Sequence, residues 1–326
     1  MKVWYDACTG KHTRYGSAIG KELNKRGHEF IFTTREHPDT LPLMKILGEK
    51  PIVVGKYNPS TLASRLQESA ERIIEFSKMF EKSKPDVAIA HQSVELCRTA
   101  FGLGIPIILT ADTPHALSVN RLTIPFAHTV VVSEALPKSF TSIYCAQKVV
   151  PFKGVDEVAW IKGFKPAKMP GLKKPLIVLR QIENKAAYAK GKADNAKTLA
   201  QQLAEVGNVH LLERYNGEGK TYGEKAVFED SASLVANADL VVSYGGTISR
   251  EAALQGVPSI AISDMAKTPV NTYVAKRGFP LYITTEEKVM GLARKYLGKR
   301  FDVSAKLAEL ENPVDVIANL VEALKT

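Results

Sequence analysis

The stretch that decides the fold is residues 237–262, N-A-D-L-V-V-S-Y-G-G-T-I-S-R-E-A-A-L-Q-G-V-P-S-I-A-I. Residues 240–242 are apolar, as in a buried strand, and residues 247–255 have helical spacing with one apolar side. Gly256 fits the position just after a helix end, and residues 259–262 form the next apolar strand. The stretch therefore predicts a strand, a helix and a second strand that form one βαβ unit.

Two glycines, Gly245 and Gly246, lie between Ser243 and Thr247, where the first of these strands meets the helix. Glycine leaves backbone N–H groups uncovered, and N–H groups at a helix N-terminus favour an anion such as phosphate. Glu251 follows one turn into the helix, where its carboxylate can accept hydrogen bonds from the two hydroxyls of a ribose. Together they indicate a nucleoside diphosphate; the alternative is a plain turn with a solvated glutamate.

Composition sets the scale and the charge of the protein. The chain has 326 residues, of which 45% are hydrophobic, enough for two domains with a core each. Its net charge of +10 favours anionic partners. The lysines are dispersed along the sequence, which weakens the case for nucleic acid without excluding it.

Cysteine usage and hydropathy point to a cytoplasmic protein. Cys8, Cys97 and Cys145 are far apart and show neither metal-ligand spacing nor a disulfide framework, so we expect no metal. The N-terminus enters a strand directly, without a signal peptide, and no apolar run has the length of a transmembrane segment. Peripheral contact with a membrane stays open.

The chain opens with a strand at residues 3–5, a polar loop at residues 6–14, a helix at residues 15–26 and a strand at residues 29–34. This order is typical of a doubly wound α/β domain, which binds ligands at the carboxyl ends of its strands. The loop supplies a candidate base or phosphate donor and two candidate anion contacts: His12, Lys11 and Arg14. A solvated loop histidine is the alternative for His12.

A second polar loop, residues 111–121, follows the strand predicted at residues 107–110. It carries four further candidates: Asp112, His115, Asn120 and Arg121. The alternative is a capping loop in which Asp112 bonds its own backbone. Between the two loops, residues 60–82 predict a long helix with one apolar side: Leu62, Leu66, Ala70, Ile73 and Ile74.

Two similar α/β domains in tandem are expected, because the βαβ pattern around residues 86–106 repeats around residues 239–258. We predict an N-terminal domain over residues 1–152, a linker over 153–174 and a C-terminal domain over 175–310. The terminal helix, within 311–326, is expected to pack back towards the N-terminal domain. Within the linker, Gly154 to Glu157 is interpreted as a hinge turn, with a ligand contact as the alternative.

Arg180 follows the first strand of the second domain, at its carboxyl end. Its guanidinium can bind phosphate in a bidentate way. The alternative is an inter-domain salt bridge.

The whole chain resembles the GT-B fold, two Rossmann-like doubly wound parallel-sheet domains that face a central cleft. GT-B proteins include sugar-nucleotide glycosyltransferases and the non-hydrolysing UDP-N-acetylglucosamine 2-epimerases. More closely, it resembles the DUF354 family of archaeal and bacterial proteins. The resemblance rests on four groups: Asp6 with Lys11 and His12; Lys25 to Glu29; Arg180 with Glu183 and Tyr188; and Gly245 to Thr247 with Arg250 to Ala253. The run Thr13 to Gly16 departs from the family pattern.

The resemblance implies a metal-independent glycosyltransferase without a cofactor, whose donor is a nucleoside diphosphate sugar with UDP as the expected nucleotide. The diphosphate would lie against Arg180 and the glycine turn, from Ser243 to Thr247, with the ribose on Glu251. The acceptor, an anionic or lipid-linked glycan among the candidates, would bind near Lys11, Arg14, Asn120 and Arg121. His12 is the first candidate for the catalytic base, with Asp112 or His115 as the second. A homodimer is compatible with this reading.

Two alternatives stay open. One is an epimerase with altered acid/base residues. Epimerases of this fold carry three acids at positions that here hold Ser93, Ala111 or Asp112, and Leu117 or Ser118, and they carry a histidine where this chain has Arg180. The other is a nucleotide-sugar-binding protein without catalysis.

Overall fold

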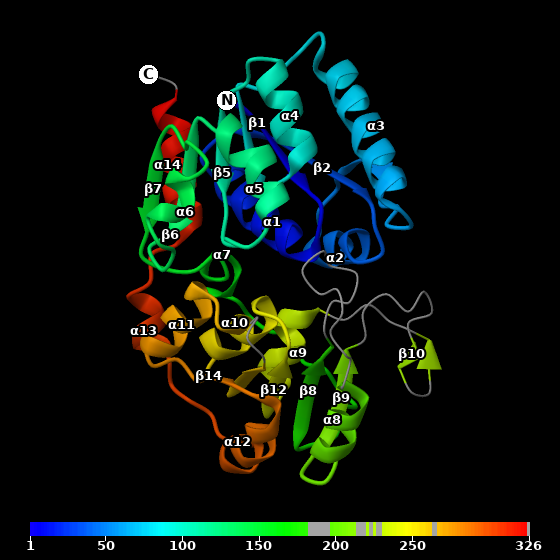
Figure 1. The fold of residues 1–326 in the computed structure, drawn as a ribbon, viewed down its shortest axis with the longest axis vertical. Coiled ribbons are helices and arrows are strands. Elements are labelled where there is room, and N and C mark those ends of the chain that lie inside the picture. The colour runs from blue at the N-terminus through cyan, green and yellow to red at the C-terminus, as the bar shows by residue number, and fades with distance from the viewer. Residues whose placement is uncertain (182–195, 213–219, 222–223, 226–229, 263–265, 325–326) are drawn as a thin grey trace. The chain divides into compact units, whose positions relative to one another are not determined.

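The computed structural model describes residues 1–181, 196–212, 220–221, 224–225, 230–262 and 266–324 (Figure 1). The chain forms two compact units. The first unit joins Met1–Trp160 to the C-terminal segment Glu311–Thr326, and the second is Ile161–Leu310. The first unit is therefore discontinuous in sequence, and it extends beyond residue 152, the predicted end of the N-terminal domain.

The first unit contains a seven-stranded parallel sheet of strand order β3-β2-β1-β4-β5-β6-β7. Its strands are β1 (Lys2–Ala7), β2 (Glu29–Glu36), β3 (Ile52–Lys56), β4 (Val87–His91), β5 (Ile107–Thr110), β6 (Thr129–Ser133) and β7 (Val149–Phe152). Its helices are α1 (Gly10–Lys25), α2 (Thr40–Leu47), α3 (Leu62–Phe80), α4 (Val94–Gly102), α5 (Leu117–Thr123), α6 (Ser139–Ser142) and α14 (Pro313–Ala323), with a 3-10 turn η1 (Ile124–Phe126). Helix α7 (Val158–Ile161) lies at the boundary of the two units.

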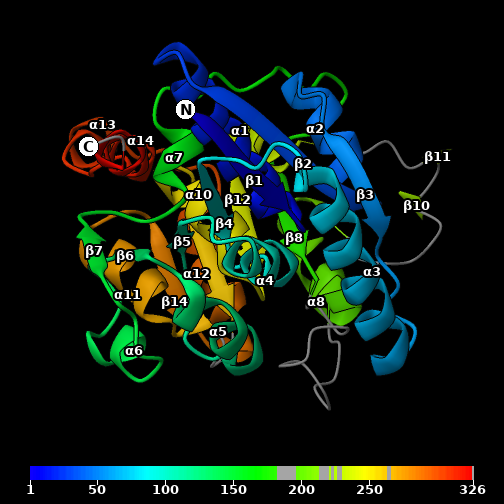
Figure 2. The same ribbon diagram turned by 90° about the horizontal axis from the view of Figure 1, so that it is seen from above.

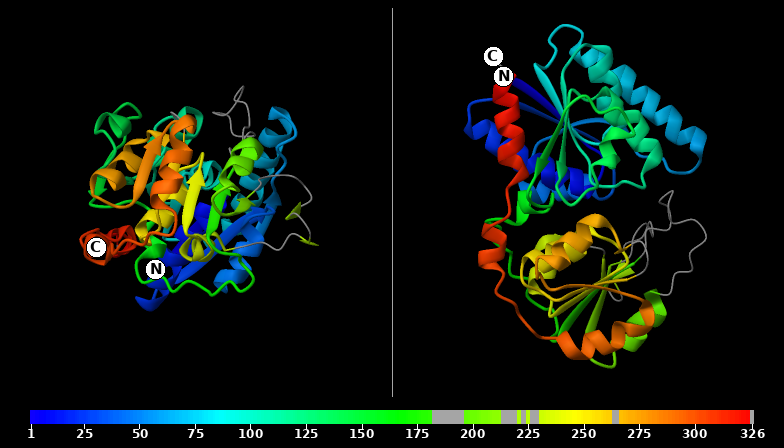
Figure 3. Two further views of the ribbon diagram at one scale, coloured as in Figure 1. Left: turned by 90° about the horizontal axis from the view of Figure 1, so that it is seen from below. Right: turned by 60° about the vertical axis from the view of Figure 1, so that its left-hand side comes forward.

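Helices cover both faces of this sheet (Figure 3). Helix α1 packs with α2 and α14, and α4 packs with α3 and α5. The central strands are consequently buried on both sides, and β4 is buried at every residue. On the α3 side, the indole of Trp4 lies against the rings of Phe76 and Phe80, with centroid distances of 4.9 and 4.7 Å.

Helix α14 completes the first unit by packing against α1. Its buried side is apolar and includes Val314, Ile317 and Val321. At the rim, the guanidinium of Arg26 donates to the Asn319 side chain at 2.7 Å. The last helix of the chain is thus part of the domain that begins at its first residue.

The second unit contains a five-stranded parallel sheet of order β14-β13-β12-β8-β9. Its strands are β8 (Leu176–Arg180), β9 (Asn208–Leu212), β12 (Leu240–Ser243), β13 (Ser259–Ile262) and β14 (Leu281–Thr284), beside a small pair β10 (Lys220–Thr221) and β11 (Glu224–Lys225). Its helices are α8 (Ala196–Leu203), α9 (Ser231–Asn237), α10 (Thr247–Leu254), α11 (Pro269–Lys276), α12 (Val289–Tyr296) and α13 (Ser304–Ala308), with a 3-10 turn η3 (Glu286–Lys288).

Side chains of alternate residues in these strands belong to two apolar clusters on opposite faces of the second sheet. Leu240 and Val242 belong to one cluster, whereas Val241 belongs to the other. This alternation is what a strand between two helix layers requires. The opening βαβ stretch is confirmed as β12, α10 and β13.

Two segments that the sequence predicted as polar loops are partly helical. Helix α1 begins at Gly10, because Thr9 is its N-cap and accepts a hydrogen bond from the backbone N–H of His12. Lys11, His12 and Arg14 therefore lie on a helix and not in a loop. Similarly, α5 takes up the end of the second loop, so that Asn120 and Arg121 are helical. Among the described residues, no helix combines the length and the apolar composition needed to cross a membrane.

Candidate functional site

The first candidate site lies at the carboxyl end of the sheet in the first unit. Helix α1 follows β1 and brings Lys11 and His12 to this edge in its first turn. Strand β4 ends in His91, and Asp112 comes two residues after the end of β5. Because all these strands are parallel, their carboxyl ends meet at one edge, where α/β sheets bind ligands.

The ammonium of Lys11 lies among three carboxylates. It forms a short ion pair with Asp112, lies 2.8 Å from Asp156 Oδ2 and lies 3.8 Å from Glu157 Oε1. Asp156 and Glu157 are buried, although the sequence placed both in a hinge turn. Lys11 thus joins α1, the loop after β5 and the segment after β7.

His91 is the functional candidate that sequence reasoning missed. Its Nδ1 lies 2.7 Å from Thr110 Oγ1, and its Nε2 lies 3.7 Å from Asp112 Oδ1. The rings of His12 and Tyr15 lie 5.0 and 5.7 Å from its ring. The sequence did offer one indication of His91: it lies at the carboxyl end of an apolar strand, the same edge of the sheet that carries the other candidates.

Burial controls the protonation of two groups at this site. It raises the pKa of Asp156 to about 6, although the charge of Lys11 acts in the opposite direction. Burial, followed by the positive charge of Lys11, lowers the pKa of His12 to about 3, so that its ring is neutral at pH 7. The backbone N–H of Cys8 donates to His12 Nδ1 at 3.3 Å, which leaves the proton of the neutral ring on Nε2. His12 therefore presents a hydrogen-bond donor, its Nε2–H group.

A buried network lies at the base of the same edge. Arg72 of α3 donates to Asp6 Oδ1 at 2.7 Å and to the carbonyl of Val54 at 2.8 Å, and lies 3.4 Å from Glu95. Burial acts to raise the pKa of Asp6, but the Arg72 charge and hydrogen bonds from Ser93 and Thr33 outweigh it and lower the pKa. Asp6 therefore stays ionised within the core.

Within the part of the chain that the structure describes, two groups of side chains have the chemistry of metal ligands: Asp6 with Cys8 and Glu95, and His91 with Asp112 and Asp156. In each group the ligand atoms lie within 4.8 Å of one another. A cation of the chain already contacts carboxylates of both groups, Arg72 in the first and Lys11 in the second. A metal ion would have to compete with these side chains.

The remaining candidates of the first unit have different surroundings. Asn120 is buried and donates to the carbonyls of Thr113 and Pro114 at 3.1 and 3.2 Å, which fixes the loop that carries Asp112. Arg14 is buried on α1. His115 and Arg121 are exposed.

The second candidate site is the glycine turn between β12 and α10. Ser243 Oγ accepts a hydrogen bond from the N–H of Gly245 at 2.8 Å, and Gly245 is exposed. Arg180 ends β8, which pairs with β12 so that Arg180 and Ser243 are in register. A guanidinium and a glycine turn thus lie at the ends of neighbouring strands, the arrangement that favours a phosphate.

The two charged residues of α10 are buried beneath this turn. Arg250 donates to Asn271 Oδ1 at 2.7 Å, and a Cβ atom at Gly246 would lie 2.5 Å from Arg250 Nη1. Gly246 is therefore required for the close approach of Arg250. Glu251 is only 1% exposed and accepts a hydrogen bond from Ser231 of α9 at 3.1 Å. Glu183 and Tyr188, of the predicted motif, lie outside the described residues.

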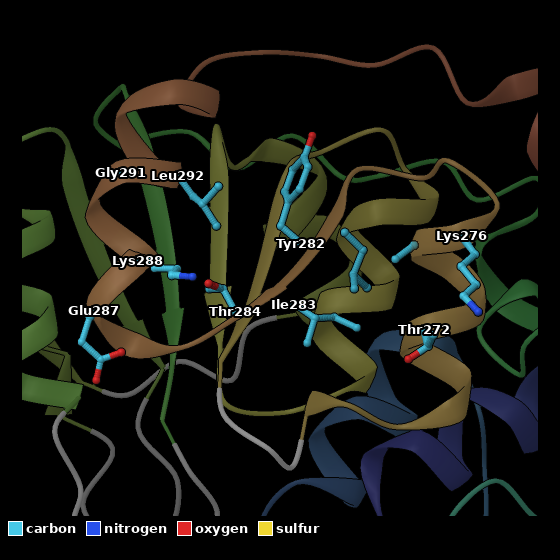
Figure 4. Close-up of a pocket in the computed structure, with 11 residues that line it drawn as sticks. Thr272, Lys276, Tyr282, Ile283, Thr284, Glu287, Lys288, Gly291 and Leu292 are labelled. Atoms are coloured by element: carbon cyan, nitrogen blue, oxygen red, sulfur yellow. The ribbon is translucent and has the colours of Figure 1, made fainter.

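A hollow of about 680 Å³ borders β14 in the second unit (Figure 4). Residues of α11, β14, η3 and α12 line it, among them Lys276, Tyr282 and Lys288. None of the residues predicted as site residues is among those that line it.

The chain matches a known protein family over nearly its whole length. Residues 1–325 match the model of a family described as a protein of unknown function, DUF354. An uncharacterised protein of Methanocaldococcus jannaschii is 30% identical over 335 residues, which cover 97% of this chain and 96% of that protein.

Solved structures share the fold at low identity. The UDP-GlcNAc 2-epimerase of Methanocaldococcus jannaschii, in complex with UDP-GlcNAc and UDP, superposes with a TM-score of 0.72 at 16% identity, covering 99% of this chain and 100% of that one. Spinosyn forosaminyltransferase SpnP superposes with a TM-score of 0.63 at 13% identity, covering 100% of both chains. The predicted class, two Rossmann-like parallel-sheet domains of GT-B type, is confirmed.

Proposed function

The chain belongs to the DUF354 family, and we propose that it is a GT-B-type glycosyltransferase that uses a nucleoside diphosphate sugar. The observation that carries this proposal is the exposed glycine turn at the start of α10, in register with Arg180 on the neighbouring strand. Similarity to a forosaminyltransferase and to an epimerase in complex with UDP-GlcNAc and UDP supports this substrate class.

In this proposal the second unit binds the donor. The backbone N–H groups of Gly246 and Thr247 and the guanidinium of Arg180 contact the diphosphate, and they stabilise it as it leaves. Glu251 is the proposed ribose ligand. Since it is nearly fully buried against Ser231, ribose binding requires Ser231 to move from its carboxylate. UDP is the proposed nucleotide.

The first unit binds the acceptor and supplies the base. Asp112 is favoured over His12, because the proton on Nε2 and the low pKa of His12 make it a poor proton acceptor. Asp112 takes the hydroxyl proton of the acceptor, whose oxygen bonds to the anomeric carbon of the sugar while the bond from that carbon to the diphosphate breaks. Lys11 holds Asp112 in place, and His12 donates a hydrogen bond to the acceptor.

A thermal-shift titration tests donor binding. We expect one of UDP, GDP, CDP and dTDP to raise the melting temperature, since a ligand that binds only the native state stabilises it. Arg180→Gln should raise the dissociation constant of that nucleotide at least about tenfold, equivalent to about 1.4 kcal/mol. The matched control is Lys276→Gln, in the hollow beside β14, which should bind as the wild type does. No shift with any nucleotide, or an unchanged shift in Arg180→Gln, would refute the donor site.

Catalysis is tested with the selected donor. Slow transfer of the sugar to water gives a readout without a known acceptor. Asp112→Asn should reduce this rate by about 10²-fold or more, the usual contribution of a general base. His12→Gln should reduce it less. Binding without turnover in any condition would favour the non-catalytic alternative.

One observation favours a second function, epimerisation at C2 of the sugar. Asp112, Asp156 and Glu157 bring three carboxylates to the first unit, and burial gives Asp156 a pKa of about 6, suited to proton exchange at neutral pH. Incorporation of deuterium at C2 from deuterated water would identify this activity. If no deuterium is incorporated, epimerisation is rejected in favour of sugar transfer.

A further inference from the structure

Helix α3 exposes an apolar side to solvent. Leu62, Leu66 and Ile74 are 79%, 71% and 52% exposed. The buried residues of the same helix are Arg72, Phe76 and Phe80, on a face that adjoins the exposed apolar one. Helix α3 lies at the outer edge of the first unit in two perpendicular views (Figures 1 and 2). The apolar side that the sequence shows is therefore the side that the domain leaves uncovered.

The exposed face has a coiled-coil spacing, in which Ala63, Leu66 and Ala70 are exposed and Ile73 and Ser77 are half-buried. Steps of three and four residues run down one face of α3 through Ala63, Leu66, Ala70, Ile73 and Ser77. We call these five residues the α3 seam. Such steps keep a seam facing a partner helix that crosses at about 20°. No charged residue belongs to the seam, and Leu62 and Ile74 flank it with further apolar surface.

We propose that the α3 seam is a homodimer interface, in which α3 packs antiparallel against α3 of a second copy about a two-fold axis. An isologous contact must be self-complementary, and the seam meets this condition. With the axis beside Glu68, Leu66 faces Ala70 of the partner subunit, and Ala63 faces Ile73 of the partner subunit. Every such layer pairs one large side chain with one small one, as close packing requires.

The charges of α3 favour a protein partner over an anionic membrane. The exposed polar side of the helix carries Glu71, Glu75 and Lys78, two acids and one base. A helix that lies on an anionic membrane carries mainly Lys and Arg on its polar side. A second copy has no such requirement.

The size of the surface indicates a dimer of modest affinity. Nineteen residues of α3 span about 28 Å, and stable interfaces bury about 800 Å² on each partner. Edge strand β3, which packs beside α3, exposes Ile52 and Val53 and so offers additional apolar area. The dimer should therefore dissociate measurably on dilution.

Sedimentation velocity of the full chain over a range of concentrations tests the proposal. The wild type should be dimeric at high concentration. Leu66→Glu should raise the dissociation constant at least about 30-fold, which corresponds to about 2 kcal/mol. Lys78→Glu, on the same helix but outside the seam, is the matched control and should dimerise as the wild type does. Because Leu66 is exposed, circular dichroism should show an unchanged fold.

A size swap tests the antiparallel register. Leu66→Ala removes the large partner from two layers, and Ala70→Leu places two leucines in each of them, so each change alone should weaken the dimer. The double variant L66A/A70L restores one large and one small residue per layer and should recover dimerisation. Recovery supports the two-fold packing; equal loss in all three variants contradicts it.

Three other results would overturn the proposal. The first is a wild type that is monomeric at every concentration. The second is a dimer that Leu66→Glu leaves intact. The third is a monomer that binds phosphatidylglycerol vesicles through Leu66, which would assign the seam to a membrane.

Discussion

The ammonium of Lys11 lies 2.8 Å from the carboxylate of Asp156, a residue 145 positions further along the chain. This contact joins the first turn of α1 to the segment that leads into α7. Asp112, from the middle of the domain, bonds the same ammonium. Three distant parts of the first unit therefore meet at one charged group, and the charge state of that group should affect both stability and activity.

The raised pKa of Asp156 predicts a pH-dependent stability. The folded protein holds this proton up to about pH 6, whereas in the unfolded chain the pKa is near 3.8. In this window the folded state binds more protons, so the free energy of unfolding decreases as the pH rises from about 4 to about 6. Urea unfolding across this range should show that decrease in the wild type relative to Asp156→Asn. A wild type whose free energy of unfolding stays constant or rises relative to that of Asp156→Asn over this range would contradict the prediction.

Arg72 should be essential for the stability of the first unit. Arg72→Met leaves the carboxylate of Asp6 buried without its guanidinium, which costs about 3–5 kcal/mol. Arg72→Lys keeps a charge but cannot bond Asp6, Glu95 and the Val54 carbonyl together, so it should recover only part of this loss. Trp4 and Trp160, the only tryptophans, both lie in this unit, so tryptophan fluorescence reports its unfolding. Lys78→Met is the control, and a loss below about 1 kcal/mol in Arg72→Met would count against the prediction.

The glycine turn offers a matched pair of substitutions. Gly246→Ala places a Cβ atom 2.5 Å from Arg250 Nη1, which Asn271 holds in place, so we expect a loss of about 1–3 kcal/mol. At Gly245 the nearest atom is Ser243 Oγ at 3.5 Å, an ordinary contact, and Gly245→Ala should be nearly neutral. Thermal unfolding compares the two. In an Arg250→Met background the cost of Gly246→Ala should shrink; an unchanged cost would show that Arg250 is not its cause.

Helix α14 should contribute strongly to the first unit. Ile317 is fully buried between α14 and the rest of that unit, so Ile317→Ala should cost about 2–5 kcal/mol. Asp315→Ala, on the exposed side of the same helix, should cost less than about 1 kcal/mol. Urea unfolding followed by tryptophan fluorescence checks both. Equal effects of the two substitutions would mean that α14 is not part of this core.

Local patterns were enough to predict the two sheets and their motifs. The apolar run at residues 240–242 and the turn at Gly245 and Gly246 appear in the structure as the sequence indicates. Such features depend on residues that are close together in the sequence, so the spacing of apolar residues is enough to predict them. The helix start at Gly10 was missed, although the signal was local, because Thr9 was not recognised as a cap.

Contacts between distant residues were the part that the sequence could not provide. Asp156 and Glu157 were interpreted as part of a hinge turn, and nothing near them in the sequence indicates that they are buried beside Lys11. Arg72 belongs to an amphipathic helix, and nothing near it in the chain indicates that Asp6 is its partner. The sequence also did not show which side of α3 faces the sheet, because a helical pattern identifies an apolar side without showing what covers it.

The discontinuity of the first unit has a consequence for biosynthesis. A ribosome that has completed Met1–Trp160 must still make Ile161–Leu310 before α14 is available, a delay of roughly 8–30 s at about 5–20 residues per second. During this time the surface of α1 that α14 covers is open to solvent or to chaperones. The second unit, which is contiguous, has all of its residues at the end of that interval, before α14 has been made. The domain whose synthesis begins first is therefore the last to be completed.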